Sequence, residues 1–223
     1  MLKFEIVKTK PITQKTKGKR TMKNYIKINN QKIELTDEQV SEIQKSFGIS
    51  SIKLSDIPVG ETFKIGEYEF FVLDRLFNSS IVGLKDTLAD GKEFGKNNNY
   101  KGSYVDDICN NFADKIAGII GKENLHTFEV DLTSDDGLKD YGSVDRKMFL
   151  LTANLYRKYV EILDKQKLDK YWWLSTPHST PTHSNGNWVK CVSPSGFIIV
   201  NCYYYNFGVL PFCILNSNIF VSK

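Results

Sequence analysis

Two histidines in a polar segment near the C-terminus are the first residues whose types and spacing suggest chemistry. His178 and His183 lie five residues apart in HSTPTHSNGN, among serine and threonine hydroxyls. A histidine beside a hydroxyl can act as the base of a nucleophile–base pair, and histidine is also a common metal ligand. No Asp or Glu lies between Lys170 and the C-terminus, so a carboxylate that orients an imidazole must come from a distant segment. The composition is typical of a flexible loop, and we therefore predict binding rather than catalysis here.

An acidic segment, VDLTSDDGLKDYG, suggests calcium chemistry at first sight. Asp131, Thr133 and Asp135 are spaced like the early ligands of an EF-hand loop. The required glycine then falls one place late at Gly137, and Gly142 stands where a bidentate Glu belongs. We therefore expect a solvated loop and no metal site.

The remaining chemical motifs also argue against catalysis. The four cysteines, Cys109, Cys191, Cys202 and Cys213, form no CxxC or His/Cys cluster, and we expect them to be reduced and buried. The chain contains no Walker-type loop, G-x-G-x-x-G or G-x-S-x-G. We predict no catalytic residue, no metal ligand and no cofactor.

A tyrosine- and asparagine-rich stretch follows the histidines and suggests recognition. Tyrosine offers a large amphipathic contact area at small entropic cost, while Ser and Asn adapt their hydrogen bonds, as in antibody loops. If Tyr203–Tyr205 lie on a strand, alternate side chains point oppositely, so at least one ring must be exposed. The predicted ligand-binding residues are His178, Thr180, Thr182, His183, Asn185, Asn187, Ile199, Asn201, Tyr203, Tyr204, Tyr205, Asn206 and Phe207.

The elements that must position these residues indicate an α+β fold with three parts. We expect a flexible basic leader over 1–22, a hairpin–helix unit over 23–58 and a ligand-binding domain over 59–223. Met22 is an alternative start. In the hairpin–helix unit, the hairpin turns at Asn29-Asn30, and Thr36 with Gln39 forms the capping box of the helix.

The ligand-binding domain begins with β-type runs and ends in further strands. Ser103 and Thr152 are expected to cap its two helices. The adjacent Trp172 and Trp173 either form an aromatic platform or, on a strand, send one ring into the core and one to the other face, and we favour core packing.

Charge and hydropathy limit the environment and partners. Residues 1–27 hold nine Lys or Arg and one acid, whereas the remainder carries a net charge of −4. The basic stretch could contact nucleic acid, but a solvated leader is the preferred interpretation. The N-terminus lacks the apolar core of a signal peptide, and no apolar run approaches the roughly 20 residues that span a membrane. We expect synthesis in the cytoplasm, no membrane partner, and later assembly into a virion or surface particle as an open alternative.

Two motifs resemble the signature of an uncharacterised domain family of gut-type bacteria and their phages. YWWLSTP and GVLPFCIL are similar to that family's WWLRSP and GVRPALWL, and RKMFLLTANLYRKY resembles its D-K-V-F-L-L-S-x-x-E-Y-x-K-Y segment. The resemblance covers roughly residues 60–220 and implies the C-type-lectin-like fold shared by formylglycine-generating enzymes and by variable proteins of diversity-generating retroelements. Ser175 and Leu210 replace the family's two arginines, and no copper-binding cysteine pair is recognisable, so neither role carries over.

The amino-acid usage near the C-terminus fits a diversified segment. Adenine mutagenesis of AAC or AAT codons yields neither Lys, Glu, Gln, Met nor Trp, and the run from Cys191 to Ser222 contains none of these five. A core strand that avoids charge would look similar, so both explanations stay open.

We therefore expect a non-enzymatic recognition protein, associated with a phage or prophage, that binds a protein or glycan through a variable surface. Two alternatives remain. One is an oxidoreductase related to formylglycine-generating enzymes, acting through Cys191, Cys202 or Cys213. The other is a phage inhibitor of a host defence system. A homo-oligomer is left open, and nucleic acid is not the expected ligand.

Overall fold

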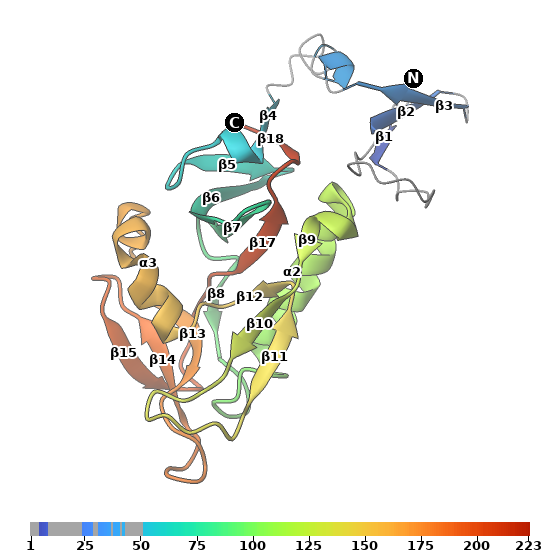
Figure 1. The fold of residues 1–223 in the computed structure, drawn as a ribbon. Helices are drawn as coiled ribbons and strands as arrows, with labels where there is room; N and C mark the ends of the chain where they lie inside the picture. Colours follow the sequence, from blue (N-terminus) through green and yellow to red (C-terminus); the bar gives the residue numbers. More distant parts are fainter. Residues whose placement is uncertain (1–4, 9–23, 29–30, 37, 41, 43–50) are drawn as a thin grey trace. The chain divides into compact units, whose positions relative to one another are not determined.

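The computed structural model describes residues 5–8, 24–28, 31–36, 38–40, 42 and 51–223, and these fall into two units. The first unit covers residues 1–51 and the second covers 52–221. Figure 1 shows the elements of both units. The predicted turn at Asn29-Asn30 lies outside the described residues, as do most of residues 1–22.

The first unit contains a three-stranded antiparallel sheet of β1 (Glu5–Lys8), β2 (Asn24–Ile28) and β3 (Gln31–Leu35). The pairing of β2 with β3 confirms the predicted hairpin. Strand β1 was not anticipated, because the sequence analysis assigned no strand to residues 1–22. The capping box is confirmed: Thr36 N donates to Gln39 Oε1 at 2.9 Å, and Gln39 N donates to Thr36 Oγ1 at 3.2 Å.

The second unit is α+β and rich in strands, and its first sheet has eight of them in the order β12-β17-β7-β6-β5-β18-β4, with β9 paired to β17. This sheet brings the start and end of the unit together, since β5 neighbours β18. Its strands are β4 (Ser51–Lys53), β5 (Thr62–Ile65), β6 (Tyr68–Arg75), β7 (Ser79–Leu84), β9 (Leu125–His126), β12 (Met148–Phe149), β17 (Phe212–Asn216) and β18 (Phe220–Ser222).

A second sheet of five strands has the order β15-β14-β13-β16-β8. A separate two-stranded ribbon, β10 with β11, borders the acidic segment. The strands are β8 (Ala89–Lys92), β10 (Phe128–Asp131), β11 (Ser143–Arg146), β13 (Trp172–Pro177), β14 (Trp188–Val192), β15 (Ile198–Cys202) and β16 (Phe207–Val209), and the short 3-10 turns are η1 (Leu54–Asp56) and η2 (Lys122–Asn124).

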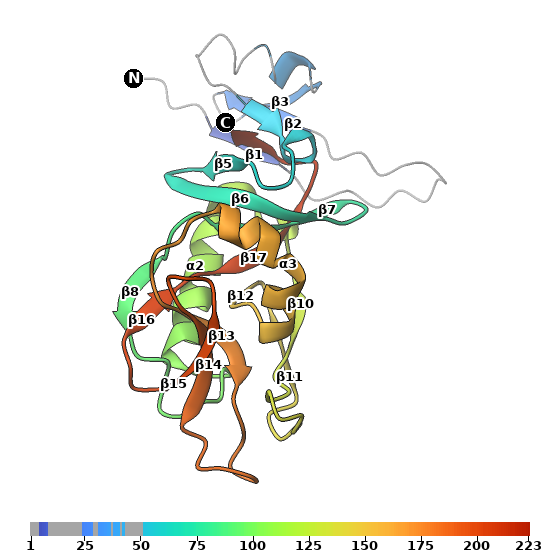
Figure 2. The same cartoon turned by 90° about the vertical axis from the view of Figure 1, so that its left-hand side faces the viewer.

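Two helices join these sheets, and both begin where the sequence predicted. Ser103 caps α2 (Tyr104–Ile120) by accepting from Asp106 N, and Thr152 caps α3 (Ala153–Lys165) by accepting from Leu155 N. Helix α2 packs on β12, β9, β16 and β5, whereas α3 packs on β13 and β6. Figure 1 shows α3 and α2 on either side of strand β6, and Figure 2 shows the two helices in a view turned by 90°.

Strand β13 is buried along its whole length, and it settles the interpretation of the paired tryptophans. Trp172 and Trp173 are 3% and 0% exposed, so the prediction of core packing is confirmed. The Trp172 ring contacts Tyr156 and Phe212, whereas the Trp173 ring contacts Phe94 and Phe207. The two rings therefore serve opposite faces of one strand.

A buried ion pair attaches the start of α2 to the β10–β11 ribbon. Asp106 is fully buried, and its two oxygens accept from Nε and Nη2 of Arg146 at 2.7 Å each. Gly102 N also donates to the Asp106 carboxylate at 2.9 Å. Bidentate hydrogen bonds between charged groups are strong and hold both side chains in a fixed geometry. Loss of one partner would leave an uncompensated charge in the interior.

Ser175 is buried on β13. Its Oγ has no hydrogen-bond partner among the residues that the structure describes. The equally buried Ser80, by contrast, has an Oγ that lies 2.7 Å from Ser217 Oγ and also accepts from Arg75. A buried hydroxyl without a partner costs free energy, whereas a paired one is compensated.

We expect Asp106→Asn to lower the free energy of unfolding by about 3 kcal/mol, because Arg146 then faces a neutral amide. Urea unfolding followed by circular dichroism measures this. Asp107→Asn is the matched control, since Asp107 lies in the same first helical turn but is exposed. Equal losses from both variants would assign the effect to the helix dipole and not to the ion pair.

We expect Ser175→Ala to raise the free energy of unfolding by about 1 kcal/mol, because it removes a hydroxyl that has no partner. Ser80→Ala should lower it by about the same amount, because it breaks a satisfied pair. Thermal and urea unfolding of the two variants gives the comparison. A loss of stability in Ser175→Ala would show that the hydroxyl has a stabilising partner.

Candidate functional site

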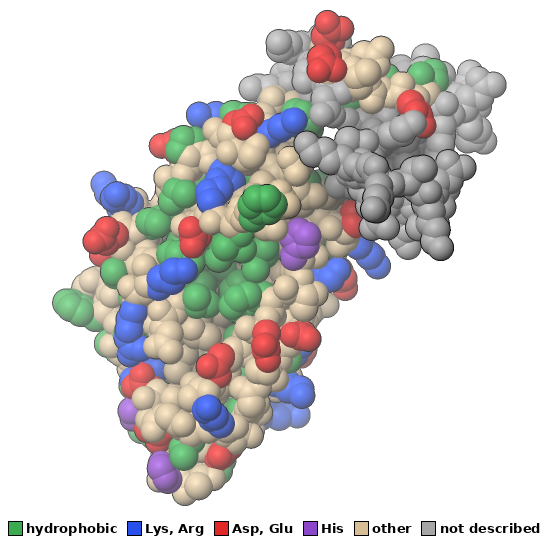
Figure 3. Space-filling model, viewed as in Figure 1, with side chains coloured by type: hydrophobic (Ala, Val, Ile, Leu, Met, Phe, Trp, Pro, Cys, Tyr) green, Lys and Arg blue, Asp and Glu red, His purple; other side chains and the backbone are tan. Residues whose placement is uncertain are grey.

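The histidine loop, residues 178–187 between β13 and β14, is held by carboxylates of the acidic loop, residues 132–142 between β10 and β11. Asp136 accepts from Ser179 Oγ at 2.7 Å, and its carboxylate lies 3.3 Å from Nδ1 of His183. Asp140 accepts from Thr180 Oγ1 and Thr182 Oγ1 at 2.6 and 2.5 Å. Figure 3 shows histidine and acidic side chains together at this end of the unit. The carboxylates do come from a distant segment, as the sequence requires.

A third carboxylate ties the acidic loop to the sheet. Asp135 lies 2.7 Å from Nζ of the buried Lys190 on β14, 3.2 Å from Arg157 on α3 and 4.0 Å from Nδ1 of His178. Burial raises the pKa of the Asp135 carboxyl, but hydrogen bonds and positive charge from Lys190 and Arg157 lower it. The net effect is a lowered pKa. Asp135 thus anchors the acidic loop. Asp131, by contrast, accepts a local hydrogen bond from Thr133 N at 2.9 Å.

Asn98, which was not among the predicted site residues, joins the two ends of the histidine loop. Its Nδ2 donates to Ser179 O at 2.6 Å and to Trp188 O at 3.0 Å, and its backbone N donates to Gly186 O. Tyr141 of the acidic loop donates to Asn98 Oδ1 at 2.7 Å. The buried Asn98 side chain therefore joins three segments of the chain. In the sequence, the asparagine-rich run around it indicated a turn and not this role.

These contacts separate the predicted loop residues into two groups. Thr180 is fully buried, and Asn187 is half-buried, so both support the loop from inside. Thr182, His183 and Asn185 are exposed, as is His178. Only the exposed side chains are free to meet a ligand.

The arrangement around the histidines does not form a nucleophile–base pair among the described residues. The Ser179 hydroxyl donates to Asp136 and not to an imidazole, and both rings face carboxylates. Within the same part of the chain, no three His, Cys, Asp or Glu residues are grouped to hold a metal ion. The local chemistry is that of a hydrogen-bonded loop.

The three tyrosines lie in the turn after β15 and not on a strand as expected. The strand pairing ends at Cys202, and the chain turns at Tyr203–Tyr205 before β16 begins. The argument from strand alternation was therefore wrong, because the turn residues, and not a pleat, set the ring directions. The expected exposure nevertheless holds: Tyr204 and Tyr205 are 53% and 48% exposed, and Tyr203 is half-buried.

The exposed rings continue into a stacked series, here called the aromatic row, of Tyr204, Tyr205, Phe207 and Tyr171. Centroids are 5.5 Å apart for Tyr204–Tyr205, 6.2 Å for Tyr205–Phe207 and 5.1 Å for Tyr171–Phe207, with interplanar angles of 21°, 26° and 21°. Tyr171 is 43% exposed and was missed, although it immediately precedes Trp172. The row therefore combines Tyr171, just before β13, with two residues of the turn before β16 and with Phe207 of β16 itself.

Core contacts anchor this row from below. Phe207 contacts Trp173 at a centroid distance of 4.7 Å, and Trp173 Nε1 donates to Lys92 O at 2.8 Å. The backbone of Tyr203 donates to Asn187 O at 2.9 Å and accepts from Phe94 N at 2.7 Å. The tyrosine turn and the histidine loop are thus directly joined.

The other predicted residues on β15 and after it have separate surroundings. Ile199 packs against the core, and Asn201 Nδ2 lies 3.5 Å from Cys191 Sγ. Asn206 is exposed beside the aromatic row. A polar group borders the far end of the row, where Lys170 Nζ lies 2.9 Å from Asp86 and 3.2 Å from Asp90.

All four cysteines are free and buried. Burial raises the pKa of Cys191 to about 11 and that of Cys109 to about 12, and it raises that of Cys213 further. A reactive thiol requires a lowered pKa and exposure, so this environment favours structural cysteines over the oxidoreductase alternative.

Comparison with known protein families, with curated proteins and with solved structures finds no match. Within the described part of the chain, none of the helices has the length and apolar character needed to cross a bilayer.

We expect the histidine loop to loosen in acid. Hydrogen bonds from Ser134 and Ser179, together with His183, lower the pKa of Asp136 from 3.8 to about 2. A carboxyl with a lowered pKa contributes stability that is complete above pH 3.8 and is lost as the pH falls towards 2. The protection factors of residues 178–187, which correct hydrogen exchange for the intrinsic pH dependence of the rate, should therefore fall across this window.

Asp136→Asn should speed hydrogen exchange of residues 178–187 at neutral pH. It should also reduce the loss of protection that these residues show between pH 3.8 and 2. Asp145→Asn is the control, because Asp145 is exposed on β11 and away from the loop. Unchanged exchange in Asp136→Asn would show that the other carboxylates suffice.

Proposed function

We propose that this chain is a non-enzymatic recognition protein whose contact surface is the aromatic row with the exposed part of the histidine loop. The observation that carries the proposal is the series of stacked, solvent-exposed rings supported by a fully buried strand. Its ligand is a protein or a glycan. Both ligand classes present surfaces that large amphipathic rings can cover.

The energetics of the aromatic row favour binding. Tyrosines are over-represented among residues that dominate binding energy, and contiguous exposed aromatic surface is uncommon on monomeric proteins. Because each ring stacks on its neighbour, the rings hold their positions before a ligand arrives. Little side-chain entropy is then lost on binding, which is the benefit of preorganisation.

We also propose a C-type-lectin-like scaffold for residues 59–223. Three features support it: the neighbouring positions of β5 and β18, the two helices, and the strand-rich second half. The motifs that carry the resemblance lie on strands, since WWLSTP forms β13 and GVLPFCIL runs from β16 into β17. The buried Ser175 and Leu210 occupy the places where the family has arginine.

Origin in a phage or prophage and diversification by a retroelement remain part of the proposal. Burial accounts for the restricted composition of much of the C-terminal run, because Phe212–Leu215 on β17 are all buried. Exposed positions that could vary at small cost to the fold are Ser195, Phe197, Tyr204, Tyr205 and Asn206. A neighbouring genomic near-repeat that differs only at adenines would support diversification.

We expect the double variant Tyr204→Ala, Tyr205→Ala to fold normally and to lose binding by at least about tenfold. Wild type and variant are screened on a glycan array and against a displayed peptide library, with unfolding midpoints measured in parallel. Phe77→Ala is the control, because Phe77 is 99% exposed but lies in the β6–β7 turn. Ligands that bind all three proteins equally would place the contact surface elsewhere, and unfolding of the double variant would assign these tyrosines to the core.

A further inference from the structure

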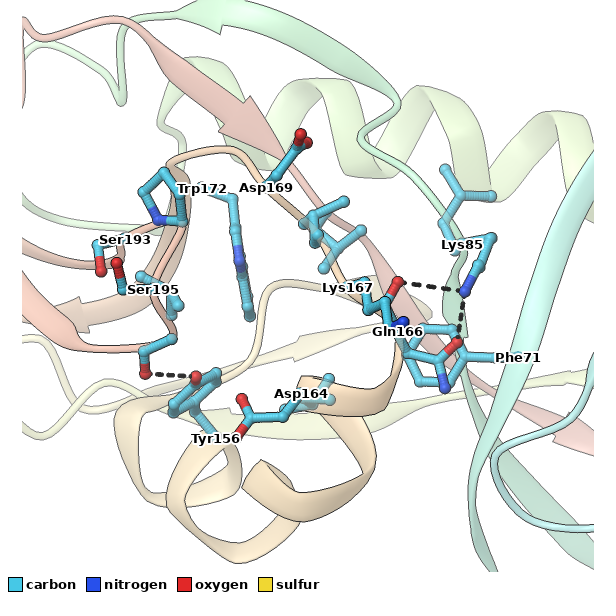
Figure 4. A pocket seen from close by; sticks show the side chains of 17 residues that line it. Phe71, Lys85, Tyr156, Asp164, Gln166, Lys167, Asp169, Trp172, Ser193 and Ser195 are labelled. Atoms are coloured by element: carbon cyan, nitrogen blue, oxygen red, sulfur yellow. Dashed lines mark hydrogen bonds between the residues drawn. The ribbon is translucent and has the colours of Figure 1, made fainter.

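A cavity of about 350 Å³ lies between the C-terminal end of α3, β13 and the turn that joins β14 to β15. Its volume is at the lower end of small-molecule pockets, which run from about 300 to 1,000 Å³. Figure 4 shows Trp172 standing between the serines of the turn and the side chains around Lys85. The apolar part of the lining consists chiefly of Phe71, Leu84, Leu163, Trp172, Val192 and Leu210.

The cavity is closed on one side by a fixed turn. Tyr156 of α3 donates from its hydroxyl to Gly196 O at 2.7 Å. Gly196 has a φ of +78°, and a Cβ there would lie 3.0 Å from Asp164 Oδ1. A residue other than glycine would thus be strained and would press on the carboxylate. Burial, with Asp164 nearby, raises the pKa of Tyr156 to about 12, so this hydroxyl stays a donor.

Charges of both signs line the same cavity. Lys85, Lys167, Asp164 and Asp169 all contribute to its wall. Among the described residues, none of these four forms an ion pair within 4.0 Å. The half-buried Lys85 ammonium donates only to neutral acceptors, Gln166 O at 3.2 Å and Gln166 Oε1 at 2.9 Å. The wall therefore offers separate positive and negative groups over an apolar surface.

Lys167 occupies a strained backbone position at this cavity. Its φ of +53° makes it the one non-glycine residue with positive φ in the described part of the chain. It directly follows the C-cap Gln166, at the position where helices commonly place glycine. A left-handed conformation costs a residue with a side chain roughly 1 kcal/mol. What lysine offers here over glycine is its side chain, which lines the cavity.

We propose that this cavity binds a small zwitterion with an apolar side chain, that is, an apolar α-amino acid. Lys167 and Asp164 belong to the same turn at the end of α3, since Lys167 N donates to Asp164 O at 3.2 Å, and both side chains line the cavity at exposed positions. In the proposed complex the Lys167 ammonium pairs with the carboxylate of the amino acid, and the Asp164 carboxylate pairs with its ammonium. Lys85 adds positive charge at the carboxylate side, and the ligand's side chain covers Trp172. This site and the aromatic row use opposite faces of β13.

The test titrates the full chain with L-phenylalanine, L-leucine and L-tryptophan by isothermal titration calorimetry. Hydrocinnamate, which lacks the ammonium, and phenethylamine, which lacks the carboxylate, are matched probes for L-phenylalanine. At least one amino acid should bind, and L-phenylalanine should bind about tenfold more tightly than either matched probe. Equal binding of hydrocinnamate would reduce the site to an anion pocket, and no binding of any amino acid at millimolar concentration would overturn the proposal.

Variants separate binding from folding. Lys167→Gly should weaken binding by at least about tenfold and should raise the melting temperature, because it relieves backbone strain. Asp164→Asn should bring the affinity for L-phenylalanine down to that for hydrocinnamate. Lys115→Ala, at an exposed position of α2, is the control for loss of one positive charge. If Lys167→Gly changes only the melting temperature, then Lys167 is not a ligand-binding residue and the proposal fails.

Discussion

Strand β13 is buried on both faces, and both candidate sites depend on it. Its two tryptophans are adjacent, so the pleat sends one to each side. Trp173 contacts Phe207 at the base of the aromatic row, and Trp172 lines the cavity beside α3. A change that moves this strand would displace an exposed surface on one side and a pocket on the other. The strand is therefore a shared support for the proposed contact surface and for the proposed pocket.

Long-range carboxylates give the polar end of the molecule its order. The histidine loop is rich in Ser, Thr, Asn and Gly, which by themselves specify no single conformation. Asp136 and Asp140 accept hydrogen bonds from its hydroxyls, and Asp135 joins the acidic loop to Lys190 on β14. The acidic segment, which resembles the beginning of a calcium loop, thus uses its carboxylates within the protein. The exposed loop side chains are presented from a supported backbone.

Local signals in the sequence predicted local structure well. The caps at Thr36, Ser103 and Thr152 satisfy backbone donors within three residues, so their effect is legible from the sequence. Strand alternation accounts for the opposite directions of the two tryptophans, and packing on both faces of β13 buries them. The tyrosine turn was assigned wrongly, because three aromatic residues have high strand propensity and their turn is set by contacts with Asn187 and Phe94.

The sequence by itself determined which residues are suited to recognition: adjacent tyrosines, a polar loop with two histidines, and an α+β framework capped at known positions. Only the tertiary structure decided which of them are available. Thr180 is buried and donates to Asp140, and Tyr171 stacks on Phe207 of the aromatic row although it comes from a different segment. Lys167 and Trp172 line the same cavity. Residue type and spacing act over a few residues, whereas burial, ring stacking and cavity walls depend on segments that are distant in the chain.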